Sequence, residues 1–341
     1  MAIAVDFDNV NIVFGADPES ALVMMDEMKE RTEIQAKTGQ VLGVHNCSLT
    51  VDEGEILVLM GLSGSGKSTL LRAVNGLNPV IRGAVRVDSG NGIVDVATAD
   101  TATLRQLRLT RVAMVFQQFG LLPWRNVREN VGLGLELAGM DKAERNDRVN
   151  AQLELVGLAD WADRKVGELS GGMQQRVGLA RAFATEAPIL LMDEPFSALD
   201  PLIRTRLQDE LLDLQAKLGR TIIFVSHDLD EAFKIGDRIA IMEGGRIVQA
   251  GTPQQIFTSP ETEYVADFVA HMNPLGVLCA HDVMEPVTGT PPSSVAPDAT
   301  IQEVMTAAQG HDAPVGVMLD GTLVGQITRN GILAKLLDPR G

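Results

Sequence analysis

A glycine-rich segment from Gly61 to Thr69 carries the clearest chemistry of the chain, Gly-Leu-Ser-Gly-Ser-Gly-Lys-Ser-Thr. Glycines allow successive backbone N–H groups to converge on phosphate oxygens, and the start of a following helix adds positive charge there. Lys67 supplies a mobile cation for the β and γ phosphates, and the Ser68 hydroxyl can ligate Mg2+. The segment therefore predicts a nucleoside triphosphate site formed by Gly61, Ser63, Gly64, Ser65, Gly66, Lys67, Ser68 and Thr69.

Two adjacent carboxylates, Asp193 and Glu194, follow an apolar run that is typical of a buried strand. Asp193 is placed to hold Mg2+, and Glu194 to act as the general base that polarises an attacking water. A simpler interpretation makes Glu194 a surface carboxylate at a strand end. The phosphate-binding loop in the same chain favours the catalytic interpretation.

Gln117 and His227 also follow expected strands, over residues 114–116 and 221–226. The Gln117 amide can contact Mg2+ or the attacking water, although a lone Gln is more often an ordinary surface residue. His227 stands where it would reach the γ phosphate, although a lone His is more often structural. We predict both as catalytic residues beside Glu194, and Gln117 also as a ligand of Mg2+.

Buried strands must position these side chains. Residues 55–60 carry a continuous apolar run after Glu55, as in a strand buried on both faces, and lead directly into the glycine loop. A helix is expected over 69–75, ended by Gly76. Residues 188–193 and 221–226 predict two further buried strands. This strand–loop–helix order is the context that a phosphate-binding loop requires.

The other segments before residue 270 extend this pattern. Residues 3–14 alternate apolar and polar side chains, as an edge strand does. Residues 18–39 predict one helix, with Glu27 and Arg31, and Glu33 and Lys37, at i,i+4 spacing. Residues 104–167 are less apolar and predict an inserted helical subdomain. Further strands are expected at 44–51, 238–242 and 246–250, the last two as a hairpin.

Composition narrows the function classes. The chain has 341 residues, enough for two domains, and a formal net charge of −16, which argues against gripping nucleic acid. Cys47 and Cys279 lie far apart and are expected to be buried free thiols. We expect neither a secretory signal nor a membrane-spanning run, so membrane association would come through a partner.

The motifs stand in the order and spacing of the ATP-binding-cassette ATPases, and the chain resembles that family over about residues 1–260. The motifs that carry the resemblance are Gly61–Thr69, Gln117, Leu169–Gln175, Met192–Pro195, Ser197–Asp200 and His227. The resemblance implies hydrolysis of ATP with Mg2+ as cofactor. It also implies an α/β P-loop NTPase fold, with a RecA-like core, an antiparallel β subdomain and an inserted helical subdomain.

Leu169–Gln175 resembles the signature loop of that family, and Ser170 can cap the next helix. In the family this loop closes over the γ phosphate of an ATP held by a second subunit, so the resemblance implies a head-to-tail homodimer. The residues that it assigns to the partner's ATP are Ser170, Gly171, Gly172, Gln174 and Asp200. Phe14 occupies the position of the aromatic residue that stacks on adenine, although residues 18–39 separate it from the phosphate loop.

Three details resemble bacterial uptake transporters for quaternary amines: Lys37-Thr38-Gly39, Met60–Gly66 and Phe119–Arg125. The pattern looks closest to choline importers, with glycine betaine, proline betaine or carnitine as alternative cargo. The resemblance implies two integral-membrane permease subunits and a periplasmic or extracellular substrate-binding protein, without nucleic acid. It implies a peripheral protein on the cytoplasmic face of a bacterial plasma membrane.

The domain boundaries follow from composition. We predict an ATPase domain over 1–270 and a linker over 271–297, rich in Pro, Ser, Thr and Gly. Residues 298–341 resemble a single CBS module, with helices over 299–309 and 331–337 and two strands around Asp320-Gly321. Such modules usually bind ligands as pairs. Either two tails pair, or the tail is a dimerisation or purely structural element.

Two other classes share the cassette motifs. Soluble cassette proteins of translation or DNA repair commonly carry two cassettes or a long coiled coil, and this chain shows one cassette and no long heptad run. Exporter ATPases are often fused to membrane spans, which this sequence lacks. The sequence therefore favours the energy-coupling ATPase of an importer.

Overall fold

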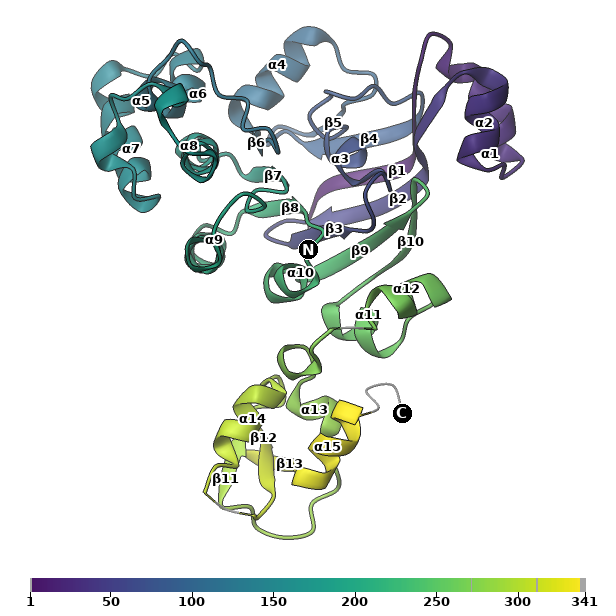
Figure 1. Ribbon diagram of the computed structural model, residues 1–341, viewed down its shortest axis with the longest axis vertical. Coiled ribbons are helices and arrows are strands. Elements are labelled where there is room, and N and C mark those ends of the chain that lie inside the picture. Colours follow the sequence, from purple (N-terminus) through teal and green to yellow (C-terminus); the bar gives the residue numbers. More distant parts are fainter. Residues whose placement is uncertain (1, 271, 311, 338–341) are drawn as a thin grey trace. The chain divides into compact units, whose positions relative to one another are not determined.

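The computed structural model describes residues 2–270, 272–310 and 312–337, which divide into two compact units (Figure 1). The first unit contains the chain up to His227 together with residues 240–247. The second contains residues 228–239 and the chain from Val248 onward. Among the described residues, no helix is both long and apolar enough to cross a membrane.

A six-stranded sheet holds the strands that lead to the predicted chemistry. Its spatial order is β10 (Arg246–Gly251), β9 (Arg238–Glu243), β3 (Ile56–Met60), β8 (Thr221–Val225), β7 (Ile189–Asp193) and β6 (Val112–Val115). β3, β8 and β7 are buried at every residue, which confirms the three strands predicted from apolar runs. Parallel pairing from β3 through β6 brings the carboxyl ends of these strands to one edge.

The helix after the glycine loop, α3 (Lys67–Leu71), begins and ends earlier than expected. Turns continue the chain to Gly76, whose φ of 67° ends the segment. The predicted hairpin is confirmed as β9 and β10, which are joined at Gly244 and Gly245 with φ of 56° and 87°. Left-handed conformations at both turn residues suit the right-handed twist of paired strands.

A second sheet, of four strands, has the order β2 (Val41–Asp52), β1 (Ile3–Phe14), β4 (Arg82–Asp88) and β5 (Ile93–Asp95). The prediction of β1 as an edge strand is wrong, because β1 pairs antiparallel with both β2 and β4. Alternation of apolar and polar residues reports that one face of a strand is covered. This pattern does not indicate whether the strand pairs with one adjacent strand or two, because the hydrogen bonds between strands join backbone groups and do not involve side chains.

The single helix predicted over 18–39 is also wrong. The segment forms a 3-10 turn η1 (Pro18–Ala21) and two short helices, α1 (Leu22–Asp26) and α2 (Arg31–Thr38). The helical conformation is interrupted at Met28, which has a φ of 59°, so Glu27 and Arg31 do not share a helix. The other predicted pair is present, with Lys37 Nζ 2.8 Å from Glu33 Oε1. Charge spacing predicted the helical conformation but missed the break.

Helices gather at one end of the first unit, where Figure 1 shows α5, α6, α7 and α8 together. The elements of the expected insertion and its surroundings are α4 (Thr101–Thr110), α5 (Val127–Val131), α6 (Leu133–Leu137), α7 (Lys142–Leu155), η2 (Ala159–Trp161), η3 (Val166–Glu168) and α8 (Gly171–Ala184). The insertion was expected from residue 104, but β6 lies beyond that point and belongs to the six-stranded sheet. The helical segment therefore begins after β6 and continues through α8.

The second unit ends in a small α+β module. Its sheet has the order β11 (Ser293–Val295), β12 (Val315–Leu319) and β13 (Thr322–Ile327), and its helices are α14 (Ile301–Ala307) and α15 (Arg329–Leu337). The predicted turn joins β12 to β13, with φ of 49° at Asp320 and 77° at Gly321. The strands and helices expected from the tail sequence are thus confirmed, and residues 338–341 of the expected module lie outside the described residues.

The predicted linker, 271–297, is partly folded. It contains η4 (Pro274–Gly276), α13 (Ala280–Val283) and β11, and β11 pairs in parallel with β12 of the module. Leu278 and Ala280 are fully buried. Pro and Gly signal turns, but they do not reveal that apolar residues between them are covered. The second unit also contains the helices α10 (Leu229–Ile235), α11 (Pro253–Thr258) and α12 (Glu263–Phe268).

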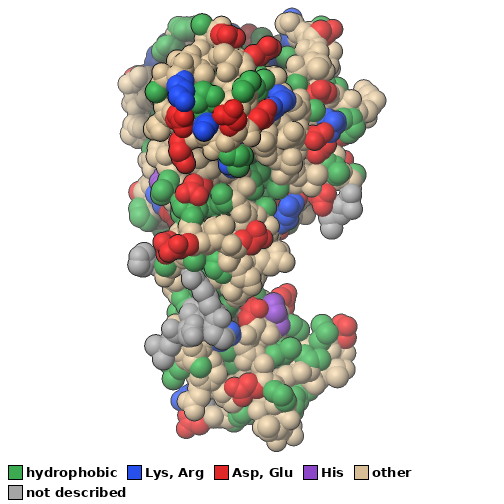
Figure 2. Space-filling model, turned by 90° about the vertical axis from the view of Figure 1, so that its right-hand side faces the viewer, with side chains coloured by type: hydrophobic (Ala, Val, Ile, Leu, Met, Phe, Trp, Pro, Cys, Tyr) green, Lys and Arg blue, Asp and Glu red, His purple; other side chains and the backbone are tan. Residues whose placement is uncertain are grey.

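The remaining composition-based expectations concern thiols and charge. Cys47 and Cys279 are both buried and free, as predicted. Asp and Glu side chains are spread over the face drawn in Figure 2, with Lys and Arg interspersed among them. This distribution agrees with the net charge of −16.

Candidate functional site

A cavity of 530 Å³ lies in the first unit, beside the glycine loop that follows β3. Most of the predicted site residues line it, and they come from several elements. The lining residues are Phe14, Arg31, Val41, Leu42, Gly43, Ser63, Gly64, Gly66, Lys67, Ser68, Thr69, Gln117, Glu194 and His227. The parallel strands place their following residues at this common edge, as ligand sites in α/β sheets do.

Backbone shape explains the glycines of the loop. Gly61 has a φ of 140°, and a Cβ there would lie 2.1 Å from the Met242 carbonyl oxygen. Gly66 has a φ of 103°, and its Cβ would lie 2.7 Å from the Gly43 carbonyl oxygen. Larger residues would therefore clash with backbone that cannot retreat. Ser65, predicted as a contact, is buried and does not line the cavity.

The Lys67 ammonium is held inside the loop. Its Nζ donates to the carbonyl oxygens of Gly61, at 2.8 Å, and Leu62, at 3.0 Å. Burial lowers the pKa of the Lys67 amine, while the carboxylates of Glu194 and Asp193 act in the opposite direction. Lys67 and the loop residues Ser63, Gly64 and Gly66 thus line the same cavity, as a site for an anion requires.

Asp193 is fully buried at the end of β7 and has two partners. Ser68 Oγ donates to its Oδ1 at 2.6 Å, and Arg72 Nη2 donates to its Oδ2 at 2.8 Å. A hydroxyl and a carboxylate at this distance are the oxygen donors that a hard cation such as Mg2+ prefers. Arg72 was not predicted, although its spacing of four residues from Ser68 was the available signal.

Two predicted catalytic side chains, Gln117 and His227, converge on the carboxylate of the third, Glu194. Gln117 Nε2 donates to Glu194 Oε2 at 3.1 Å, and His227 Nδ1 lies 3.4 Å from the same oxygen. Glu194 has a φ of 49°, a strained conformation for a residue with a side chain, and strain of this kind gathers at functional sites. Such a carboxylate, aimed into a cavity, can orient and deprotonate a water.

Phe14 lines the cavity despite the long insertion that follows it. It pairs with Val41 across β1 and β2, so the chain leaves and re-enters the sheet at one place. Its side chain is 38% exposed and packs where a Cβ on Gly43 would lie only 2.9 Å from the ring. A flat, half-open aromatic face at the cavity rim is suited to stacking on a base.

The signature-loop residues do not line this cavity. Ser170 is exposed and caps α8, accepting from Met173 N at 3.4 Å, and Gly171 beside it is also exposed. Gly172 and Gln174 are half-buried, and Gln174 donates to the carbonyl oxygens of Val166 and Leu169. Asp200 is exposed and caps α9 (Pro201–Leu218), accepting from Ile203 N. Their assignment to a partner's ATP stays a prediction.

Gln175 links the signature helix to the catalytic strand end. It is buried, its Nε2 donates to the Glu194 carbonyl oxygen at 3.2 Å, and its Oε1 accepts from Ala198 N at 3.1 Å. A shift of α8 would therefore be transmitted to the backbone of Glu194. No local pattern in the sequence predicts this contact, because a Gln within a helix is usually solvent-facing.

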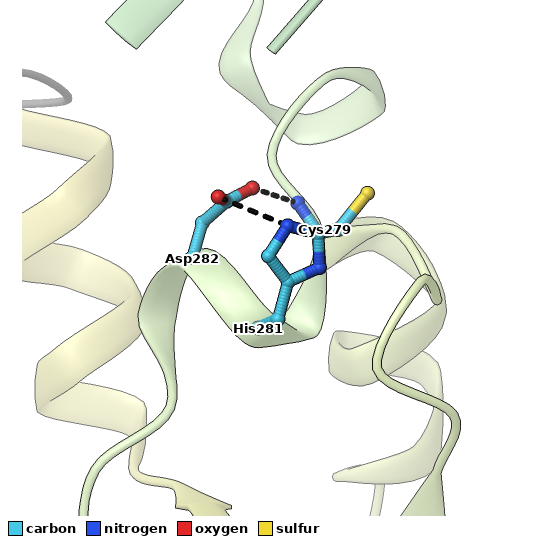
Figure 3. Close-up of side chains that lie close together, drawn as sticks. All are labelled: Cys279, His281 and Asp282. Carbon is cyan, nitrogen blue, oxygen red and sulfur yellow. Dashed lines mark hydrogen bonds and ion pairs between the residues drawn. The ribbon is translucent and has the colours of Figure 1, made fainter. Parts of the chain in front are cut away.

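A second group of polar residues lies in the tail, where Figure 3 shows Cys279, His281 and Asp282. Their potential ligand atoms lie within 4.8 Å of one another. Asp282 accepts from Cys279 N at 2.9 Å and lies 3.3 Å from His281 Nε2, while the sulfur points away from the carboxylate. His281 Nδ1 lies 2.8 Å from the Pro297 carbonyl oxygen. These contacts cap the start of α13, which is a structural role.

The fold and the cavity define a P-loop nucleoside triphosphatase. A sequence profile of the ABC transporter family matches residues 44–197. The glycine betaine/proline betaine transport ATP-binding protein ProV of Escherichia coli is 44% identical over 100% of this chain and 84% of its own length. The trimethylamine N-oxide transport ATP-binding protein TmoW of Ruegeria pomeroyi is 44% identical over 96% of each chain.

A solved structure extends the comparison to three dimensions. The ATP-binding cassette MJ0796, as a dimer in a post-hydrolysis state with ADP and Pi, aligns with a TM-score of 0.63 and 30% identity. The alignment covers 73% of this chain and 98% of the cassette. The chain belongs to the ABC transporter family, as an ATPase of the group that contains the glycine betaine and proline betaine transport subunits.

Proposed function

We propose that this chain is the ATP-hydrolysing subunit that energises import of a quaternary amine through a separate permease and substrate-binding protein. The observation that carries the proposal is the convergence of Lys67, Glu194 and His227 on one cavity, in a chain whose relatives are named as transport ATP-binding proteins. ATP is the nucleotide, and Mg2+ is its counter-ion.

The proposed residue roles are supported by the positions of the side chains around the cavity. The loop from Gly61 to Thr69 cradles the phosphates, and Ser68, Asp193 and Gln117 surround the Mg2+ site. Glu194 deprotonates the attacking water, His227 contacts the γ phosphate, and Phe14 stacks on adenine. The metal, when bound, would neutralise phosphate charge. The chain's own contribution is to hold these groups at fixed positions.

The working unit is a head-to-tail homodimer. Ser170, Gly171 and Asp200 are exposed and lie off the cavity of their own chain, so they are free to cover the ATP of a partner. The dimeric structure of the cassette MJ0796 with ADP and Pi supports this arrangement. ATP binds the closed dimer better than the open one, and this differential affinity drives closure.

Closure is proposed to act on two permease subunits at a groove of the first unit. This groove, of 290 Å³, lies between the helical segment and β6. Its apolar lining includes Leu77, Phe116, Leu133 and Leu137, which suits a short amphipathic helix of a permease. Such docking would hold the chain peripherally on the cytoplasmic face of a bacterial plasma membrane.

The tail is proposed to be a single CBS-like module over 298–341, after an ATPase domain over 1–270. A parallel pair, β11 and β12, and two helices beside the sheet support this assignment. The oligomeric state of a chain truncated within 284–292 tests whether the module pairs with its copy. An unchanged oligomeric state would leave the module a purely structural role.

Cargo is the finest level of the proposal. The sequence resemblance predicts choline, whereas the relatives ProV and TmoW favour glycine betaine, proline betaine and trimethylamine N-oxide. These molecules share a methylated cationic nitrogen. No residue of this chain is proposed to contact it, because the binding protein and permease select the cargo.

Reconstitution of the complete system in vesicles tests the proposal. ATPase activity of the complex should rise when the binding protein is loaded with its cargo. Cargo should accumulate on the side of the membrane that carries the ATPase. Choline and glycine betaine are titrated separately, and the one with stimulation at the lower concentration is the cargo. Absence of a permease partner would favour a soluble cassette protein, and outward transport would favour an exporter.

A further inference from the structure

The insertion between β1 and β2 is a packed element and not a loose loop. Residues 15–40 leave the sheet after Phe14 and return at Val41, its pairing partner. A small apolar core fills the space between the insertion and the sheet. Its members, all at most 4% exposed, are Val13, Ala21, Met25, Ile34 and Leu42. The burial of these five side chains fixes the orientation of α1 and α2 against the sheet.

An ion pair fixes the insertion from a second direction. Arg82 of β4 donates to both carboxylate oxygens of Asp26, at 2.8 Å and 3.0 Å. A bidentate pair of this kind constrains orientation as well as distance. α1 is therefore tied to the sheet on one side, and α2 follows it after the turn at Met28.

α2 begins with a cation, Arg31, that points into the nucleotide cavity. Its Nη1 donates to the Gly64 carbonyl oxygen at 2.7 Å, and its Nη2 donates to those of Leu42, at 2.5 Å, and Gly43, at 2.9 Å. A positive charge in the first turn of a helix opposes the helix dipole. The residue type at this place is therefore better explained by the three carbonyl groups than by α2 itself.

The contact with Gly64 immobilises one peptide of the phosphate-binding loop. The carbonyl of the Gly64–Ser65 peptide accepts from Arg31, and its N–H donates to the Leu62 carbonyl oxygen at 3.1 Å. The Ser65 carbonyl in turn accepts from Gly245 N at 3.0 Å. Because a peptide is planar, these bonds fix the orientation of this part of the loop, which lines the cavity at Ser63, Gly64 and Gly66.

We propose that Arg31 is a positioning residue for the nucleotide, and that the 15–40 insertion serves to deliver it to the phosphate-binding loop. The guanidinium holds the Gly64 carbonyl away from the phosphates, preorganises the loop, and adds a positive charge at the cavity rim. The inference rests on the proposed binding of ATP at this site. It assigns a role to a segment whose sequence had indicated only a helix.

The test compares Arg31→Ala, Arg31→Lys and the matched control Lys37→Ala in the full chain. Lys37 is a cation on the same helix, but it is exposed and pairs with Glu33. Arg31→Ala should raise the Kd and the KM for ATP about tenfold, since charged hydrogen bonds are lost, with kcat within about twofold. Arg31→Lys should recover part of the affinity, and Lys37→Ala should match the parent.

A further comparison separates positioning from simple anchoring of α2. The fold-loss for ATP and ADP should exceed that for adenosine, which does not reach the phosphate-binding loop. Equal loss for all three, or a lowered melting temperature with unchanged ATP affinity, would reduce Arg31 to a structural anchor. A fall in kcat with unchanged KM would overturn the positioning role as well. If the parent chain itself fails to bind ATP, the proposed function fails instead.

Discussion

Ser68 and Asp193 stand 125 positions apart in the sequence, yet Ser68 Oγ donates to Asp193 Oδ1 at 2.6 Å. One side chain comes from the first turn of α3 and the other from the buried end of β7. The parallel β3 and β7, with β8 between them, set this distance. In the proposed site, Mg2+ binds where the two oxygens meet.

Replacing Ser68 with Ala should therefore weaken Mg2+ binding more than it weakens ATP binding. A hydroxyl ligand is lost, while the loop N–H groups and Lys67 remain. We expect the Mg2+ concentration for half-maximal ATPase to rise at least about tenfold. ATP binding in the presence of a chelator serves as the control and should stay near that of the parent. An unchanged Mg2+ requirement would remove Ser68 from the metal site.

Arg72 should matter for stability, because it is the ionic partner of the fully buried Asp193. Arg72→Ala leaves a buried carboxylate without its cation, which costs about 2–4 kcal/mol of the free energy of unfolding. The value is measured by urea denaturation. Arg72→Ala combined with Asp193→Asn should lose less than the sum of the two single changes, because the pair then disappears together. Additive losses would show that the two side chains do not interact.

Much of this site could be predicted from the sequence, because its residues follow strands whose apolar runs are easily recognised. β3, β7 and β8 are uniformly apolar, and parallel strands must bring Ser68, Asp193 and His227 to one edge. Arg31 and Arg72 could not be predicted in the same way. Their roles depend on carbonyl and carboxylate groups that lie elsewhere in the sequence. The spacing of four residues between Ser68 and Arg72 places Arg72 near the loop, but it does not identify Asp193 as its partner.

The fold shows the same division. Local signals located the P-loop, the β9–β10 hairpin and the tail elements, because turn residues and apolar runs act over a few positions. The interior position of β1 and the break at Met28 depend on tertiary packing. The charge spacing predicted helical conformation within 18–39. The division of this segment into α1 and α2 follows from the packing of Met25 and Ile34 into one small core.

Glu194→Gln should bind ATP and yet turn it over at least ~100-fold more slowly, the scale expected for losing a general base. The amide keeps the size of the side chain and its contacts with Gln117 and His227. Turnover and ATP affinity are measured on the same preparation. Near-normal turnover would remove Glu194 from the role of base. Lost ATP binding would instead indicate that the left-handed backbone at this position had collapsed.

Ser170→Arg should prevent ATP-driven dimerisation without abolishing ATP binding by the single chain. Ser170 is exposed and lies off the cavity, so a large, positively charged side chain there would clash only with a partner subunit. Dimer formation is followed by light scattering with Mg-free ATP, which blocks hydrolysis. Thr110→Arg, at the exposed end of α4, is the matched control and should still dimerise. Dimerisation of the Ser170 variant would argue against the in-trans contact.

Cys47 should make the protein sensitive to alkaline pH. The thiol is fully buried and lies near the carbonyl oxygens of His45 and Gly245, and burial raises its pKa from 9.0 to about 11. The folded state therefore keeps the proton between pH 9 and 11, while the unfolded state releases it. Stability from this group is fully present below pH 9 and is lost as pH rises, by about 2 kcal/mol at pH 10.5.

Other groups titrate in the same range, so the thiol must be isolated by comparison with Cys47→Ala. That variant loses some packing at every pH, which lowers its free energy of unfolding by a constant amount. The difference between parent and variant should therefore shrink by about 2 kcal/mol between pH 8 and 10.5, because only the parent carries the buried thiol. Urea denaturation at both pH values measures it. Parallel pH profiles would mean that Cys47 ionises as readily in the folded chain as in the unfolded one.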